Sequence, residues 1–140
     1  MEKKYTIWNG IKMKNLAMYI FINKGLGMSP GKIAAQASHA AVEAYIISNT
    51  DTRDAWRLPE MHYTKLVMEA RNEKHLDTIQ KYLGDRGIKT ARIIDEGLTE
   101  LAPHQVTALG VEVVDKEEVG DVFGSFKLFT PELQINVKWK

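Results

Sequence analysis

The chain has 140 residues, of which 44% are hydrophobic and 26% are charged, and it contains no cysteine. These values are ordinary for a globular protein, and this length suits one domain, which we expect to cover residues 1–140. The lack of cysteine excludes disulfides and thiolate metal sites, and no apolar run is long enough to span a bilayer. We expect a cytoplasmic protein with no membrane partner.

The charged residues are divided unevenly along the chain. Residues 1–40 carry six lysines and one acidic residue, a net charge of +5, so the remainder carries −4. A basic first third suggests that an anionic ligand approaches one side of the molecule. Chance also divides charges unevenly, and these lysines are too scattered to identify nucleic acid by themselves.

The hydrophobic pattern predicts the elements in chain order. Residues 1–14 form a polar arm, with a short strand around residues 5–8. Strands are expected at residues 16–22, 63–70, 89–94 and 106–114, and helices at residues 30–48 and 72–86. The rest comprises a glycine-bearing loop (23–28), a polar connection that is partly helical around Ala55 and Trp56 (49–60), a helical turn (116–120), extended pieces (126–129, 134–139) and a C-terminal extension (130–140).

Strands and helices alternate in the order βαβαβ, which predicts a largely parallel sheet covered by helices. The loop over residues 95–105 is too short for a helical crossover, so we expect the fourth strand to run antiparallel to a neighbour. The sequence therefore predicts an α/β fold: a single three-layer domain with a small mixed, mostly parallel four-stranded sheet and helices on both faces.

The most informative segment begins at Ser29. Serine followed by Pro30 is typical of a helix start, and Lys32 lies in the first turn, where a cation is electrostatically disfavoured unless an anion approaches it. Four polar residues follow at spacings that predict one stripe of the helix: Lys32, Gln36, His39 and Glu43. On the opposite side, small residues allow close packing on a sheet: Ala34, Ala37, Ala40, Ala41 and Ala44.

Two interpretations of this segment come from the residues alone. It can be a solvated helix face with an ordinary cap, or a nucleotide P-loop that begins near Gly25. The P-loop fails on spacing, because Leu26 occupies the position of the first glycine and Ile33 replaces the hydroxyl that would bind magnesium. The histidines at 62, 75 and 104 show no metal-ligand spacing, so we assign no metal and no cofactor.

Three motifs carry a resemblance to a known family. Gly-Lys-Ile-Ala-Ala-Gln-Ala-Ser-His-Ala (31–40) closely resembles the first-helix signature of the type 2 peptidyl-tRNA hydrolases. Residues 93–103 resemble the second signature of that family, residues 106–110 its next strand, and residues 126–129 its usual ending. The resemblance runs in order from about Leu16 to Phe129, and leaves out the N-terminal arm and the C-terminal extension.

The resemblance implies hydrolysis of the ester between a peptide and the 3′ ribose of tRNA. The residues that it assigns to catalysis by matching positions are Lys32, Gln36, His39, Asp95, Thr99 and Thr107. The loops before Lys32 and after Asp95 both leave carboxyl ends of strands, so we expect them to converge in one site. If Lys32 and Asp95 pair, the pKa of Asp95 falls, and the carboxylate then orients water rather than abstracting its proton.

Other interpretations stay open for several residues. Gln36 and His39 could instead bond to neighbouring backbone, and Thr107 could be an ordinary strand residue. We expect Lys12, Lys14 and Lys24 to contact tRNA, whereas Trp56 and Trp139 are expected to pack rather than to stack on bases. Members of the family commonly form homodimers, so a homodimer is possible here too.

The chain departs from the family pattern in both signatures. Asn23-Lys24-Gly25-Leu26 stands where the family commonly has Arg-Thr-Asp-Leu, and Glu96 and Leu98 stand where it has alanine and arginine. The lost arginine removes a possible phosphate clamp. The leading hypothesis is an active peptidyl-tRNA hydrolase, and the alternative is a non-catalytic module on the same fold that binds tRNA or another protein.

Overall fold

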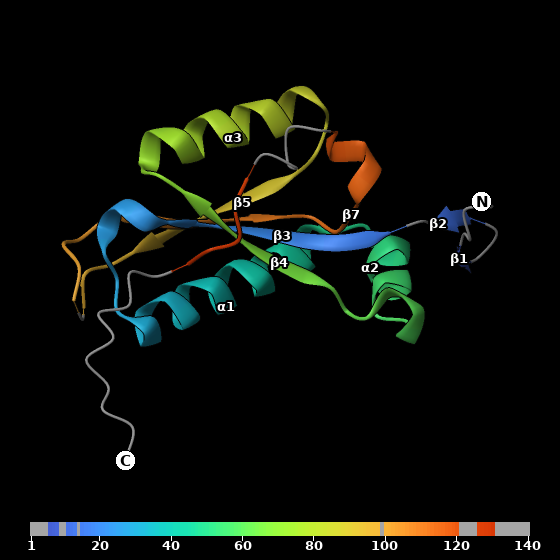
Figure 1. Cartoon of the computed structure of the whole chain (residues 1–140), viewed down its shortest axis with the longest axis horizontal. Helices are drawn as coiled ribbons and strands as arrows, with labels where there is room; N and C mark the ends of the chain where they lie inside the picture. The colour runs from blue at the N-terminus through green and yellow to red at the C-terminus, as the bar shows by residue number, and fades with distance from the viewer. Residues whose placement is uncertain (1–5, 9–10, 14, 99, 121–125, 131–140) are drawn as a thin grey trace, which may run out of the picture.

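A mixed β-sheet forms the middle layer of the protein in the computed structural model, which describes residues 6–8, 11–13, 15–98, 100–120 and 126–130 (Figure 1). Its strands lie in the order β4-β3-β6-β5. They span Leu16–Asn23 (β3), Lys65–Ala70 (β4), Thr90–Asp95 (β5) and Gln105–Val111 (β6). A short strand, β7 (Val114–Asp115), pairs with the start of β3. The predicted four strands are all present.

The directions of the strands correct one detail of the predicted sheet. Strand β3 pairs in parallel with β4, but β6 pairs antiparallel with both β3 and β5. Strands β3, β4 and β5 therefore point the same way, but β3–β4 is the one parallel pair of neighbours on this path. The sheet is mixed as predicted, but the expectation that most neighbouring strands would pair in parallel was wrong. The cause is the short loop after Asp95, which returns the chain as β6 directly beside β5.

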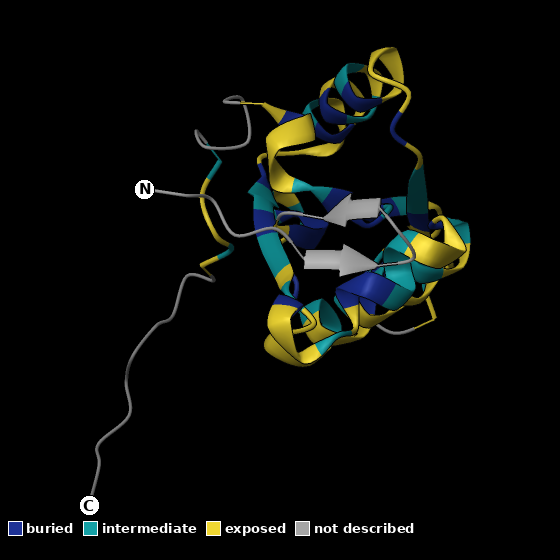
Figure 2. Ribbon diagram, turned by 90° about the vertical axis from the view of Figure 1, so that its right-hand side faces the viewer, coloured by how far each residue is buried: buried dark blue, intermediate teal, exposed yellow. Residues whose placement is uncertain are grey.

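Helices cover both faces of the sheet, which confirms the predicted three-layer α/β class. Helices α1 (Pro30–Ile47) and α2 (Thr50–Trp56) lie on one face, and α3 (Glu73–Asp85) lies on the other. Every residue of β3 is buried, and alternate residues enter the two cores: Met18 and Ile20 on the α1 side, Tyr19 and Phe21 on the α3 side. Figure 2 shows the exposed residues on the outward sides of the helices.

Helix α1 begins as the sequence predicted but presents a different face to the sheet. The Ser29 hydroxyl caps it by accepting a hydrogen bond from the Lys32 amide at 3.2 Å. The residues buried against the sheet are Gln36, Ala40 and Ala44, whereas Ala34 is exposed. The predicted outward polar stripe is therefore wrong at Gln36, because a buried hydroxyl on β6 satisfies its side chain there.

The connection after α1 is more helical than predicted. Asn49 caps α2 by accepting from the amides of Asp51 and Thr52, and one turn of 3-10 helix, η2 (Pro59–Met61), follows. Helix α3 is capped by the Asn72 side chain, which accepts from the His75 amide, and the left-handed Gly87 follows its end. The predicted turn at 116–120 is η3 (Lys116–Val119).

The two ends of the chain are described in part. Strands β1 (Thr6–Trp8) and β2 (Ile11–Met13) form an antiparallel hairpin of their own. Near the other end, Leu128 forms an antiparallel bridge with Met68 on the outer edge of β4, which agrees with the predicted extended piece at 126–129. The extended piece predicted at 134–139 lies outside the described residues. No helix among those described is long and apolar enough to cross a membrane.

Candidate active site

An ion pair joins the start of α1 to the end of β5. Lys32 Nζ lies 2.5 Å from Asp95 Oδ1, and the two side chains are only 11% and 8% exposed. Both come from the edge of the sheet where β3 and β5 end, as the sequence predicted for these two loops. The site is thus built where ligands commonly bind in open α/β sheets, outside the carboxyl ends of the strands.

The carboxylate of Asp95 is held in its charged form. The hydrogen bond from Lys32 is the largest influence that lowers its pKa below the usual range, and the Gly97 amide, which donates to Asp95 Oδ2 at 2.8 Å, lowers it further. Asp95 is therefore ionised at neutral pH. A carboxylate with a lowered pKa is a weak base but a good hydrogen-bond acceptor for a water molecule or a hydroxyl group.

The loop that follows Asp95 requires glycine at position 97. Gly97 has φ +76°, and a Cβ placed on it would lie 2.6 Å from the Pro103 backbone nitrogen. The His104 amide donates to the Asp95 carbonyl oxygen at 2.8 Å and closes the base of the loop. Glycine is the residue that adopts this conformation at no steric cost. The conformation of Gly97 directs its own amide toward the Asp95 carboxylate.

Glu100 ties this loop to the start of α1, a link that sequence reasoning missed. The Ser29 amide donates to Glu100 Oε2 at 2.9 Å, and the Ser29 hydroxyl donates to Oε1 at 2.6 Å. These two bonds are the main reason that the pKa of Glu100 is lowered. No spacing in the sequence signals a contact between these residues, because it depends on how the loop folds back over the helix.

A buried pair of polar side chains connects α1 with the sheet one helical turn beyond Lys32. The Thr107 hydroxyl lies 2.5 Å from Gln36 Oε1 and 3.3 Å from the Ile93 carbonyl oxygen. Thr107 is completely buried and Gln36 nearly so. These contacts link α1 to β5 and β6 near the end of β5.

The structure shows less about the other two predicted catalytic residues, His39 and Thr99. His39 lies on the exposed side of α1, and its charge makes a small contribution to lowering the pKa of Asp95. Thr99 lies outside the described residues. Within the part of the chain that the structure describes, no three histidine or acidic side chains gather as metal ligands would.

The two described lysines among those predicted to contact tRNA do not gather around Lys32. Lys24 lies in the 3-10 turn η1 (Lys24–Leu26) and pairs with Glu69 at 3.0 Å. Lys12 belongs to β2, which Figure 1 places at the opposite end of the molecule from the start of α1. Lys14 lies outside the described residues.

Comparison with known proteins identifies the family. The family model "Peptidyl-tRNA hydrolase PTH2" matches residues 16–129. This chain belongs to the PTH2 family. It is 38% identical to the peptidyl-tRNA hydrolase of Pyrobaculum aerophilum over 120 residues, which cover 82% of this chain and 98% of that protein.

Two further PTH2 relatives support this assignment. The peptidyl-tRNA hydrolase of Thermococcus onnurineus is 37% identical, over 76% of this chain and 92% of that protein. The probable peptidyl-tRNA hydrolase 2 of Schizosaccharomyces pombe is 34% identical, over 80% of this chain and 55% of that protein. The resemblance read from the sequence motifs is therefore confirmed, and the matched region contains both Lys32 and Asp95.

The structure explains how this PTH2 chain accommodates its departure in the first loop. Asn23 Oδ1 accepts from the Gly25 amide at 3.0 Å, and Asn23 Nδ2 donates to the Val106 carbonyl oxygen at 2.9 Å. A Cβ on Gly25 would lie 2.7 Å from the Arg71 carbonyl oxygen. The loop is therefore packed too tightly against the start of α3 for a larger residue. Leu98, one of the two departures in the second signature, is 89% exposed.

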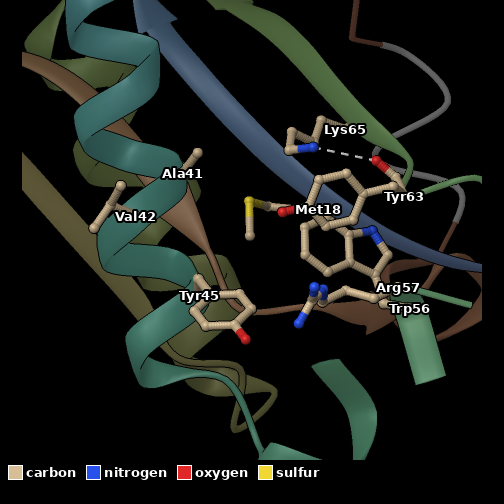
Figure 3. Close-up of a pocket in the computed structure, with 8 residues that line it drawn as sticks. All are labelled: Met18, Ala41, Val42, Tyr45, Trp56, Arg57, Tyr63 and Lys65. Carbon is tan, nitrogen blue, oxygen red and sulfur yellow. Dashed lines mark hydrogen bonds between the residues drawn. The ribbon is translucent and has the colours of Figure 1, made fainter. Parts of the chain in front are cut away.

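An apolar pocket lies apart from the ion pair, on the α1 side of the sheet (Figure 3). It has a volume of about 270 Å³ and lies between Tyr45 on α1 and the paired rings of Trp56 and Tyr63, with Met18 among its lining residues. Trp56 is buried and donates to the Thr64 carbonyl oxygen at 2.7 Å. The prediction that Trp56 is a packing residue is therefore confirmed.

Proposed function

We propose that this protein hydrolyses the ester between a peptide and the 3′ ribose of tRNA. The observation that carries the proposal is the largely buried Lys32–Asp95 pair at the carboxyl edge of the sheet, in a chain that belongs to the PTH2 family. The related proteins named peptidyl-tRNA hydrolase support the same substrate.

Ester hydrolysis needs a positioned water and a group that stabilises the developing oxyanion. A water oxygen bonds to the ester carbon, the bond from that carbon to the ribose oxygen breaks, and the ribose oxygen takes a proton. The products are a peptide carboxylate and a tRNA with a free 3′ hydroxyl. Lys32 supplies positive charge for the oxyanion, and Asp95 orients the water or the adjacent ribose hydroxyl.

The remaining residues support this pair in the proposed mechanism. Gln36 and Thr107 fix α1 over the sheet, and Gly97 and Glu100 fix the loop after Asp95. Effective catalysis needs such supporting contacts, since small displacements of the reacting groups lower the rate strongly. The assignments of Thr99 and His39 rest on the family motif.

The proposal is tested by incubating purified protein with labelled N-blocked aminoacyl-tRNA and measuring the ester cleaved. We expect cleavage by the parent, and a loss of most of it in Lys32→Ala with little change in melting temperature. Asp95→Asn is expected to lower turnover more than affinity for tRNA, because a group that serves the reacting centre acts in the chemical step. A parent that binds tRNA without cleaving the ester would favour the non-catalytic alternative.

Three properties of this protein stay predictions. We propose that Lys12, Lys14 and Lys24 contact tRNA phosphates, that the protein forms a homodimer, and that it is cytoplasmic. Neutralising the three lysines together should raise KM with little change in kcat, and the particle mass from light scattering tests the homodimer. Fluorescence microscopy of a tagged chain tests the location.

A further inference from the structure

A polar pocket opens on the α3 side of the sheet, at the end of β4. Its volume is about 370 Å³, and it is lined by Glu69, Arg71, His75, Phe126 and Lys127. Because β4 and β5 point the same way, this pocket and the Lys32–Asp95 pair lie at the same edge of the sheet. Three strand spacings of about 4.8 Å separate β4 from β5, or about 14 Å along that edge. Because the pocket lies on the α3 side of the sheet and Lys32 on the α1 side, the two sites are at least that far apart.

The pocket carries two cations that lack an acidic partner. Arg71 and Lys127 are both exposed, and neither forms an ion pair with any residue that the structure describes. The acid in the lining, Glu69, is already neutralised, since Lys24 Nζ lies 3.0 Å from its Oε1 and the Thr130 amide donates to the same oxygen at 2.8 Å. The pocket therefore presents an excess of positive charge.

An aromatic wall and a neutral hydrogen-bond donor complete the lining. His75 Nδ1 accepts from the Arg71 amide at 3.0 Å, so in the neutral ring Nε2 carries the proton. Burial lowers the pKa of His75, and the charge of Arg71 lowers it further, which keeps this form at neutral pH. The ring stacks on Phe126 with centroids 5.6 Å apart, and Phe126 in turn packs edge-on against Phe21.

We propose that this pocket binds a phosphodiester group of the single-stranded 3′ arm of the tRNA, an inference that rests on the proposed function. Cations and neutral N–H donors are the groups that hold nucleic-acid phosphates, and aromatic rings beside them contact bases. The excess positive charge favours RNA over the peptide part of the substrate. Stacked nucleotides advance about 3.4 Å each, so a separation of at least about 14 Å places the bound phosphodiester about four or more nucleotides from the ester.

The sequence does not reveal this cluster because its members come from two separate segments. Arg71 and His75 flank the start of α3, whereas Phe126 and Lys127 belong to the last described segment, which lies along β4. The Glu69 amide donates to the Lys127 carbonyl oxygen at 3.0 Å, which holds that segment in register. Lys24 also contributes to the charge of the pocket, because it neutralises Glu69 beside it.

The test compares two double variants that each remove two positive charges. Arg71→Ala/Lys127→Ala removes the pocket cations. Lys89→Ala/Lys116→Ala removes two exposed lysines near the opposite edge of the sheet, and neither forms an ion pair with a described residue. We measure Kd for uncharged tRNA over a range of salt concentrations, and kcat and KM for ester cleavage. The pocket variant should raise Kd and KM several-fold without changing kcat. The slope of log affinity against log salt concentration should flatten by about 0.7, the value for one single-strand phosphate.

The control variant should match the parent, and an equal effect of the two double variants would overturn the inference. Arg71→Lys, which keeps the charge, should retain most of the salt slope and guards against loss of local structure. A second arm uses an acceptor-stem hairpin RNA with and without its 3′ single-stranded tail. The difference in Kd between parent and pocket variant should vanish without the tail, and its persistence would assign the pocket to the tRNA body and overturn the proposal.

This design separates the inference from the proposed function. If the parent cleaves the ester but the pocket variant equals the parent in Kd and KM, the pocket inference alone fails. If the parent cleaves no ester yet the tail-dependent difference in Kd remains, the proposed hydrolase function fails and the RNA site stands.

Discussion

The hydroxyl of Thr107 lies 2.5 Å from Gln36 Oε1, in a place that water does not reach. This contact joins β6 to α1 one helical turn beyond Lys32, and the same hydroxyl lies 3.3 Å from the Ile93 carbonyl oxygen on β5. Three elements of the site therefore share one buried polar group. A buried hydrogen bond of this kind fixes the relative position of the elements, because an unpaired polar group in the core is strongly unfavourable.

We predict that Thr107→Val destabilises the protein by about 1–3 kcal/mol, because valine has the same shape but leaves Gln36 Oε1 without its donor. Urea denaturation at neutral pH measures the change in the free energy of unfolding. Thr78→Val, on the exposed side of α3, is the matched control and should stay within about 0.5 kcal/mol of the parent. Adding Gln36→Leu to Thr107→Val should recover part of the loss, and strictly additive changes would contradict the coupling.

The lowered pKa of Asp95 makes a prediction about pH. A carboxylate whose pKa is lower in the folded protein stabilises the fold at pH values above its unfolded pKa of about 3.9, and this contribution is lost as the pH falls through the lower folded value. The parent should therefore be more stable than Asp95→Asn from pH 7 down to about 5, and the difference should shrink steadily below pH 4. Urea denaturation at several pH values measures it. A difference that does not change with pH would show that the charge of Asp95 has no part in stability.

Some of the site could be predicted from the sequence because it depends on local rules. Parallel strands end at one edge of a sheet, so the loops before Lys32 and after Asp95 could be expected to meet, and opposite charges then pair. The caps of α1 and α3 are equally local, since Ser29-Pro30 and Asn72 act on the amides that follow them.

Contacts between distant segments could not be predicted in this way. Periodicity gives the polar side of α1, but it does not reveal that Thr107 offers Gln36 a buried partner, which turns this residue inward. The bonds from Ser29 to Glu100 likewise depend on the path of the loop over residues 96–104. The mixed sheet follows from the insertion of β6 between β3 and β5, and a single sequence gives the order of elements along the chain but not across the sheet.

Gly97→Ala tests the loop that follows Asp95. The backbone of Gly97 has φ +76°, and the added methyl group would meet Pro103. We expect a loss of about 1–2 kcal/mol or more from the left-handed conformation alone, together with a lower kcat as the amide leaves Asp95. Gly84→Ala is the matched control, because Gly84 lies in α3 with open space around it and alanine should stabilise the helix by about 0.5–1 kcal/mol. Wild-type kcat in Gly97→Ala would show that the loop does not position the site.

The last prediction concerns Glu100, whose carboxylate accepts both hydrogen bonds that Ser29 donates outside the helix. Glu100→Ala removes both acceptors and should release the loop from α1. We expect kcat/KM for ester cleavage to fall while the melting temperature changes little, because both residues are exposed and their bonds are weakened by water. Glu100→Gln keeps one acceptor oxygen in the same place and should restore part of the activity.

Ser29→Ala provides the reciprocal test, because it removes the hydroxyl donor at the Glu100 carboxylate but leaves the Ser29 amide. It also removes the cap on α1, which should lower stability by about 0.5–2 kcal/mol. If Glu100 acts through Ser29, the effect of Glu100→Ala on kcat/KM should be smaller in the Ser29→Ala background than in the parent. An equal effect in both backgrounds would mean that Glu100 influences the reaction by another route, such as its charge near Lys32.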